Sequence, residues 1–148
     1  MLRIEFPESA CALATTHDGR IVVVEQWRRL HQKLTLELAG GIQEDGESPT
    51  DAAVREFHEE TGLDLADGRP LMTLDMDFSG SIHKTHVCTG RLADDEQEAV
   101  PGRGIAAVRF LALVEAIDLI VDGVISHAPT VAAILWMASA HSPIEGRR

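Results

Sequence analysis

Residues 41–63 read GIQEDGESPTDAAVREFHEETGL, and the rest of the chain is best understood from this stretch. Ser48 can cap a helix with its hydroxyl, Pro49 suits the first helical position, and Asp51 follows Ser48 at capping-box spacing. Gly62 is the residue type that ends a helix in a left-handed conformation. The stretch therefore predicts a loop followed by one helix that stops at Gly62.

Three glutamates gather on one side of this predicted helix. At 3.6 residues per turn, Glu56, Glu59 and Glu60 fall on an arc roughly 100° wide. Adjacent carboxylates repel one another, and a hard divalent cation such as Mg2+ or Mn2+ relieves that repulsion. The alternative is an ordinary solvated acidic face, which is the commoner meaning of an acidic run. The neighbouring arc is expected to pack into the core and comprises Ala53, Val54, Phe57 and Thr61.

A single arginine stands beside the glutamates. Arg55 lies one turn before Glu59 and can orient it without entering the cluster. Glu47 comes from the preceding loop and can brace Arg55. These two residues are thus expected to support the site rather than to form it.

The spacing G-x5-E-x7-R-E-apolar-x-E-E-x-G-apolar over residues 41–63 resembles the signature of the Nudix hydrolases at every fixed position. This match favours the metal site over the solvated face. The resemblance implies hydrolysis of a nucleoside diphosphate linked to another group, with Mg2+ or Mn2+ held by the glutamates. It also implies an α/β fold in which a mixed β-sheet lies between helices (α/β/α), with residues 1–148 as one domain.

Two segments before this stretch narrow the resemblance. Gln26-Trp27-Arg28 and residues 36–41 (LELAGG) resemble elements of the ADP-ribose pyrophosphatase branch. In that branch the arginine contacts substrate and the carbonyl before the first box glycine ligates metal, roles that fall here on Arg28 and Gly40. Glu37 is expected to touch substrate or a partner subunit. The sequence departs from the branch at Ala39, where proline is usual, and at Gly40, where alanine is usual.

An acidic segment follows at residues 94–98 (DDEQE). On composition alone it is a solvated mobile loop. In the branch that the chain resembles, a loop at this place carries a glutamate over the metals and closes on substrate. That likeness favours Glu98 as a metal ligand and Glu96 as general base.

The resemblance thus implies a role for each candidate residue. The catalytic residues are Glu59, Glu96 and Glu98, and the substrate-binding residues are Arg28 and Glu37. The metal ligands are Gly40, Glu56, Glu59, Glu60 and Glu98. Residues supporting the site are Gly41, Glu47, Arg55 and Gly62.

Local patterns predict the remaining elements. A hairpin is expected around an Asp-Gly turn at residues 17–20, and a polar loop is expected at residues 64–69. The tail from His141 is expected to fray. The predicted strands are 3–6, 9–16, 21–27, 34–38, 71–78, 82–92 and 105–111, and the predicted later helices are 112–121 and 128–140.

Composition excludes several other classes of protein. The net charge of -11 argues against nucleic-acid backbones as partners. No apolar run is long enough to span a bilayer and no leader-like segment opens the chain, so a cytoplasmic protein is expected. Cys11 and Cys88 read as two buried, reduced thiols. His83 and His86 would point to opposite faces of a strand, which argues against joint metal ligation.

ADP-ribose is the first candidate substrate, giving AMP and ribose 5-phosphate. The alternatives are a nucleoside triphosphate or dinucleotide polyphosphate pyrophosphatase and, from another class, a non-catalytic domain that senses a nucleotide sugar. The presence of every box glutamate argues against the sensor. The resemblance also implies a homodimer, and the short N-terminal segment argues against a swapped one.

Overall fold

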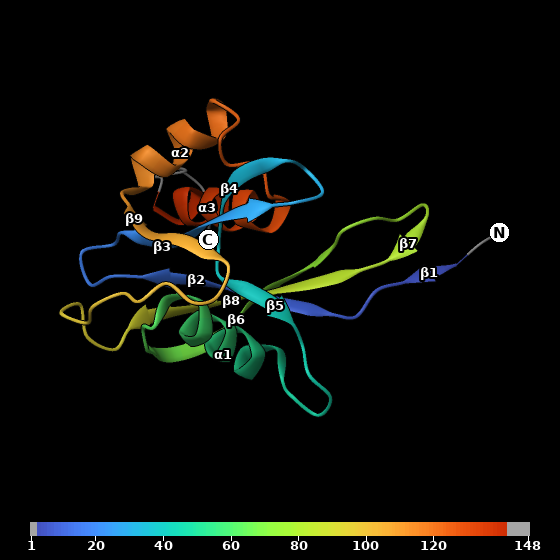
Figure 1. The fold of residues 1–148 in the computed structure, drawn as a ribbon, viewed down its shortest axis with the longest axis horizontal. Helices are drawn as coiled ribbons and strands as arrows, with labels where there is room; N and C mark the ends of the chain where they lie inside the picture. The colour runs from blue at the N-terminus through green and yellow to red at the C-terminus, as the bar shows by residue number, and fades with distance from the viewer. Residues whose placement is uncertain (1–2, 142–148) are drawn as a thin grey trace, which may run out of the picture.

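The fold, seen in a computed structural model, is described over residues 3–141 and consists of a mixed β-sheet between helical layers (Figure 1). The expected fraying of the tail falls on residues outside this range. The strands are β1 (Ile4–Glu5), β2 (Ser9–Thr15), β3 (Ile21–Arg28), β4 (Lys33–Glu37), β5 (Gly40–Ile42), β6 (Leu65–Asp75), β7 (Ser81–Ile82), β8 (Lys84–Leu92) and β9 (Ile105–Leu111). The helices are α1 (Pro49–Thr61), α2 (Leu113–Val121) and α3 (Ala128–His141).

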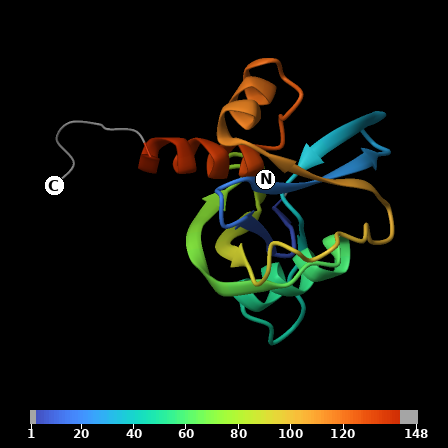
Figure 2. The ribbon, with the colours of Figure 1, turned by 90° about the vertical axis from the view of Figure 1, so that its left-hand side faces the viewer.

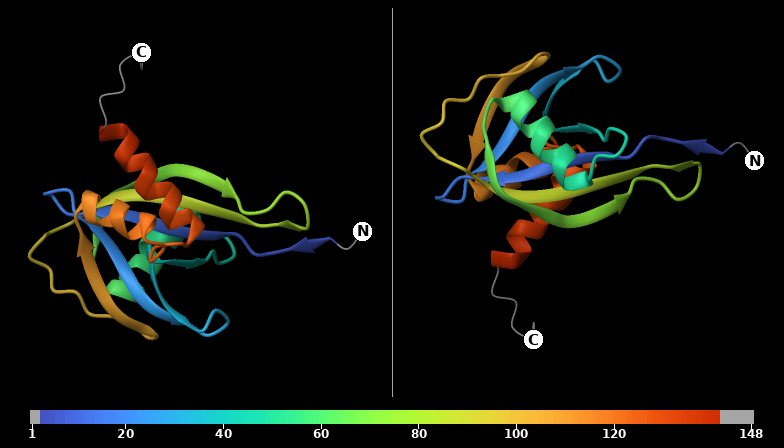
Figure 3. Two further views of the ribbon diagram at one scale, coloured as in Figure 1. Left: turned by 90° about the horizontal axis from the view of Figure 1, so that it is seen from above. Right: turned by 90° about the horizontal axis from the view of Figure 1, so that it is seen from below.

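The seven-stranded sheet follows the order β4-β3-β2-β8-β6, with β5 beside β2 and β9 beside β3. The β2–β8 pair is parallel and the other pairs are antiparallel. β1 and β7 form a separate two-stranded parallel sheet, which extends away from the body of the molecule (Figures 1 and 3). This arrangement confirms the predicted fold class.

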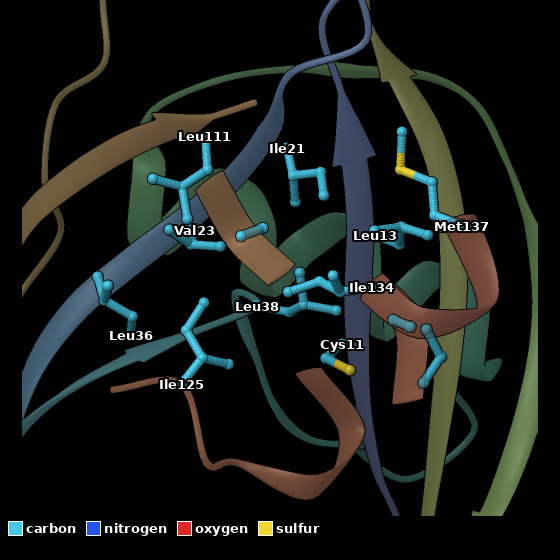
Figure 4. Close-up of a cluster of buried hydrophobic side chains, with 13 residues drawn as sticks. Cys11, Leu13, Ile21, Val23, Leu36, Leu38, Leu111, Ile125, Ile134 and Met137 are labelled. Atoms are coloured by element: carbon cyan, nitrogen blue, oxygen red, sulfur yellow. The ribbon is translucent and has the colours of Figure 1, made fainter. Parts of the chain in front are cut away.

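The central strands are apolar on both faces because helices cover both sides. α1 lies against one face, and α2 and α3 lie over the other (Figures 1 and 2). On β2, Cys11 and Leu13 face α2 and α3, whereas Ala10, Ala12 and Ala14 face α1. Figure 4 shows the first of these layers, in which Leu13 and Ile134 meet between β2 and α3. Strands buried on both faces read as continuous apolar runs, as β2 and β3 do.

Helix α1 follows the sequence prediction closely. Ser48 caps it by accepting a hydrogen bond from the Asp51 amide at 3.1 Å, and Gly62 ends it with φ +72°. Phe57 and Thr61 are fully buried. The two later helices also lie where they were predicted. None of the helices within residues 3–141 has the length and apolar character needed to cross a membrane.

Three predictions about strands were wrong. The expected loop at residues 64–69 belongs mostly to β6, an edge strand with mainly exposed side chains. The segment is polar because its side chains face solvent, not because it is a loop. A register shift there accompanies Asp67, whose φ is +55°. The strand expected to reach Phe78 ends at Asp75. The strand expected from residue 82 is interrupted at His83, between β7 and β8.

The predicted hairpin at residues 17–20 has the expected turn but not the expected pairing. Gly19 adopts φ +85°, and the Thr16 amide donates to the Arg20 carbonyl at 2.9 Å. β2 and β3 then share a single residue pair, Thr15 with Ile21. The strands separate because β2 pairs with β5 and β8 while β3 pairs with β4 and β9 (Figure 3).

Candidate active site

One side of α1 carries a carboxylate–arginine network. Arg55 Nε donates to Glu47 Oε1 at 2.7 Å and Arg55 Nη2 donates to Glu47 Oε2 at 3.0 Å, so Glu47 braces Arg55 as expected. The pKa of Glu47 falls to about 2, chiefly because of these bonds. Arg55 Nη1 also contacts Glu59 at 3.3 Å and Glu56 Oε1 at 2.9 Å. The prediction that Arg55 stays outside the cluster is therefore wrong, because its guanidinium reaches two of the three glutamates.

Glu56 and Glu60 lie against the glycines of β5. The Gly40 amide points at Glu60 Oε1, 3.4 Å away. Gly41 lies against Glu56 so closely that a Cβ at position 41 would stand 2.5 Å from the Glu56 carboxyl carbon. Any larger residue would displace that carboxylate. The glycines thus allow the backbone of β5 to approach the helix that carries Glu56 and Glu60.

Glu60 differs from the other carboxylates of the group in its raised pKa and in a buried oxygen without a hydrogen-bond partner among the described residues. Burial raises its pKa to about 7 against the opposing effect of the Gly40 amide, and the nearby Glu56 charge adds a smaller increase. Its Oε2 atom is buried and has no hydrogen-bond partner among the described residues. A buried, unpaired carboxylate oxygen is costly unless a proton or a cation satisfies it.

These observations test whether the residues fit a divalent cation. Within residues 3–141 no group of three His, Cys, Asp or Glu side chains is close enough to form a complete metal cluster. Glu59 is turned toward Arg55 and is 56% exposed. Glu56 and Glu60 nevertheless fit: they are partly buried oxygen donors beside the Gly40 backbone, and Glu60 Oε2 lacks a partner. The geometry therefore suits a cation held by the Glu56 and Glu60 carboxylates beside the Gly40 backbone, while Glu59 contacts Arg55.

The acidic segment lies at the C-terminal end of α1. Gln97 Oε1 accepts from the Asp64 amide at 2.8 Å, and the amides of Val100 and Gly102 donate to α1 carbonyls at 2.8 and 2.9 Å. The side chains of Glu96 and Glu98 are exposed and make no hydrogen bond or ion pair with any other described residue. The structure brings neither into contact with the box glutamates, and their assigned roles stay predictions.

Arg28 and Glu37 form a pair across the β3–β4 hairpin. Arg28 Nε and Nη2 each donate to one Glu37 oxygen at 2.8 Å. Glu37 is 3% exposed and also accepts from Thr35 Oγ1 at 2.5 Å. Burial alone would raise the Glu37 pKa, but the Arg28 and Thr35 hydrogen bonds outweigh it and hold the pKa below its usual range. Three of the five guanidinium N–H groups of Arg28 remain for a ligand.

Two residues that sequence reasoning missed complete this corner. His127 Nε2 lies 3.5 Å from Glu37 Oε1, and His127 Nδ1 lies 2.8 Å from Thr130 Oγ1. The Thr130 hydroxyl in turn accepts from the Leu38 amide at 2.9 Å. Because that hydroxyl can donate to Nδ1, we assign the neutral tautomer with the proton on Nε2, facing Glu37. Burial lowers the His127 pKa, which favours this neutral form. A local sequence pattern offers no signal for a contact 90 residues apart.

Two cavities meet at the Arg28–Glu37–His127 corner. The glycine cavity, of about 180 Å3, is lined by this corner together with Gly40 and Gly41. The hairpin cavity, of about 550 Å3, lies on the other side, between the β3–β4 turn and the start of α3. The predicted substrate-binding residues therefore stand between the glycines of the site and a larger hollow.

The remaining singled-out residues are two histidines and two cysteines, of which His83 and Cys11 also line the glycine cavity. His86 contacts Glu8 at 3.2 Å and Thr73 at 2.9 Å, whereas His83 packs on Phe6. Cys11 and Cys88 are buried free thiols, as expected, and they lie on opposite faces of the sheet. Burial raises the pKa of Cys11 to about 12, which makes it a poor nucleophile.

The chain matches a known protein family, and both its sequence and its fold are similar to those of known proteins. A model of the NUDIX domain family matches residues 5–134. A methanol dehydrogenase activator from Bacillus methanolicus is 27% identical over 136 residues, which cover 90% of this chain and 74% of that protein. A solved structure titled as an ADP compounds hydrolase superposes with a TM-score of 0.75 at 22% identity, over 90% of this chain and 74% of that one.

Two further relatives match over shorter stretches. An ADP-ribose pyrophosphatase from Bacillus subtilis (strain 168) is 37% identical over 59 residues, and an ADP-sugar pyrophosphatase from Mus musculus is 37% identical over 84 residues. The first match covers 40% of this chain and the second 55%. The matched part spans about a third of these two pyrophosphatases, 32% and 38% of their lengths.

Proposed function

This chain belongs to the NUDIX family, and we propose that it is a divalent-metal-dependent pyrophosphohydrolase of nucleoside diphosphate sugars, with ADP-ribose as first candidate. The family match confirms the resemblance seen in residues 41–63. The likeness to pyrophosphatases of ADP-ribose and ADP-sugars supports the choice of branch. The observation that carries the proposal is the unpaired Glu60 Oε2 beside Glu56 and the Gly40 backbone.

Glu56 and Glu60, with the Gly40 carbonyl, would hold Mg2+ or Mn2+. When bound, such an ion neutralises charge that develops on the diphosphate and lowers the pKa of a coordinated water. Glu60 must give up its proton to act as a ligand, and its raised pKa places that step near neutral pH. Glu59 contacts Arg55 in this structure and would have to leave it to serve as a further ligand.

Arg28 would hold a phosphate oxygen with the N–H groups that Glu37 leaves free. Glu37 fixes the plane of the guanidinium through two bonds, and His127 holds Glu37 from the other side. Such preorganisation reduces the entropy lost when substrate binds. Water adds to phosphorus and the bridging P–O bond breaks, so ADP-ribose would give AMP and ribose 5-phosphate. Glu96 is the proposed base that takes the proton of that water, and Glu98 is a proposed further ligand.

Two alternatives use the same residues. A nucleoside triphosphate or dinucleotide polyphosphate pyrophosphatase needs the same glutamates but a different pocket. A sensor would bind a nucleotide sugar without turnover. The homodimer implied by the branch and a cytoplasmic location remain predictions.

Hydrolysis of a substrate panel with Mg2+ and with EDTA tests the proposal. The panel contains ADP-ribose, a UDP-sugar, a GDP-sugar, NADH, a diadenosine polyphosphate and the deoxynucleoside triphosphates. We expect preference for ADP-ribose that chelation abolishes. Preference for a triphosphate would refute ADP-ribose as the substrate but would still support metal-dependent hydrolysis. Binding without turnover of any compound would favour the sensor.

A further inference from the structure

The hairpin cavity carries an excess of positive charge in a strongly acidic protein. Its lining includes the cationic side chains of Arg28, Arg29 and Lys33 beside His31 and the neutral His127, while the whole chain has a net charge of -11. The one acidic residue in the lining is Glu37, which is buried and already paired with Arg28. A concave site of one sign of charge concentrates ligands of the opposite sign.

Two of these cations have no acidic partner. Among residues 3–141, Arg29 forms no ion pair, and the Lys33 ammonium has a hydrogen bond only with the Ser126 hydroxyl, at 3.3 Å. Lys33 also stands directly opposite Arg28 in the β3–β4 register. Like charges opposite each other across two strands destabilise the pairing, and an anion between them would remove that cost.

The position of the hairpin cavity links it to the candidate active site. Arg28, Glu37 and His127 line both cavities, and the glycine cavity continues to Gly40 and Gly41. A ligand with its diphosphate beside the glycines would touch Arg28 and could extend past it into the hairpin cavity. Trp27, 57% exposed, offers an aromatic surface there on which a base or sugar ring can lie.

We propose that the hairpin cavity binds a phosphate monoester on the substrate, beyond the diphosphate that is cleaved. The preferred substrates would then be nucleoside diphosphate compounds that carry a third phosphate. Arg29 and Lys33 would bind that group, and Ser126 would donate a further hydrogen bond. This inference rests on the proposed pyrophosphohydrolase activity and refines its substrate. ADP-ribose lacks a third phosphate, so it would be hydrolysed less efficiently than related compounds that carry one.

Matched substrate pairs test the inference, since each pair differs by one phosphate. NADH and NADPH differ at the 2′ position of the adenosine ribose, and dephospho-coenzyme A and coenzyme A differ at the 3′ position. We expect kcat/KM to be at least about tenfold higher for the phosphorylated member of one pair, the ratio expected for one charge-assisted hydrogen bond. In the double variant Arg29→Gln/Lys33→Gln that ratio should fall toward one.

Binding without metal gives an independent readout. In EDTA, calorimetry would compare AMP with adenosine 2′,5′-bisphosphate and adenosine 3′,5′-bisphosphate on the wild-type and double-variant proteins. Arg91→Gln is the matched control, because Arg91 is exposed on β8, outside both cavities. It should leave the ratio unchanged.

The results separate this inference from the proposed function. Turnover without any phosphate preference, or a preference that survives the double variant, overturns the inference and leaves the function standing. No turnover of any compound, with a bisphosphate preference that the double variant removes, supports the anion site and refutes the function.

Discussion

The buried pair between Arg28 and Glu37 makes a prediction about stability that can be worked from the structure. Replacing Glu37 by glutamine keeps the shape of the side chain and removes its charge. Two charge-assisted hydrogen bonds to Arg28 are lost or weakened, each worth about 1.5–3 kcal/mol when buried. The Arg28 side chain is 46% exposed, so we discount their sum by about half.

A second contribution comes from the amide that replaces one carboxylate oxygen. In either orientation its NH2 group faces an Arg28 N–H, from Nε or from Nη2, and a buried donor without an acceptor costs about 1 kcal/mol. The total is about 3 kcal/mol of unfolding free energy. For a domain of this size that corresponds to a fall of about 6–12 °C in Tm.

Urea unfolding at pH 7 in EDTA measures the effect. The variants are Glu37→Gln, Arg28→Gln and the double variant, which together isolate the pairwise coupling, expected at about 2 kcal/mol. Glu25→Gln is the control, because Glu25 lies on β3, the strand of Arg28, without a side-chain hydrogen bond to a described residue. It should cost less than about 0.5 kcal/mol. A Glu37→Gln cost as small as the control, or additive single effects, would refute this account of the pair.

The same pair has a defined pH dependence. The Glu37 pKa is lowered in the folded state, so its stabilising contribution is present above the ordinary glutamate pKa of about 4.3. That contribution is lost as the pH falls through the lowered, folded-state pKa. The difference in unfolding free energy between wild type and Glu37→Gln should therefore shrink in acid and be constant from about pH 5 upward.

Two further predictions concern the glycines and Glu60. Gly40→Ala should lower Tm by several degrees, because its Cβ would collide with the Ala10 carbonyl. Gly41→Ala should mainly displace the Glu56 carboxylate, so turnover should fall while thermal unfolding changes little. Equal losses of Tm in the two variants would contradict this distinction. The pKa of Glu60 is about 7 when folded and about 4.3 when unfolded, so the folded state binds more protons between these values. In EDTA the unfolding free energy of wild type should fall relative to Glu60→Gln as the pH rises through that window, and parallel pH profiles from urea unfolding would count against a buried Glu60.

Local signals made α1 predictable from sequence. Ser48, Pro49 and Gly62 act on their immediate neighbours, and the spacing of Glu56, Glu59 and Glu60 follows from helix geometry alone. The relation between Glu47 and Arg55 was also predictable, because both belong to one contiguous motif. Helix spacing does not predict the direction in which each carboxylate points, and two of them, on Glu56 and Glu59, form hydrogen bonds with Arg55.

Contacts between distant segments were not predictable in the same way. The pairing of β2 with β8 depends on residues more than 70 positions apart, and without it residues 9–28 read as a plain hairpin. β6 was misread because an edge strand is polar like a loop. His127 and Thr130 contact Glu37 and Leu38 because the start of α3 lies beside the end of β4.

The most direct test of the central claim is the turnover of ADP-ribose by Glu60→Gln at saturating Mg2+ and pH 8. The account predicts a fall in kcat of at least about a hundredfold, equal to about 3 kcal/mol of lost transition-state stabilisation, in a protein that unfolds at no lower temperature than wild type. Glu115→Gln should keep full activity, because Glu115 lies on α2 and, within the described part of the chain, is paired only with Arg109 at 3.9 Å. Undiminished turnover by Glu60→Gln would contradict the assignment of Glu60 as a metal ligand and, with it, the proposed site.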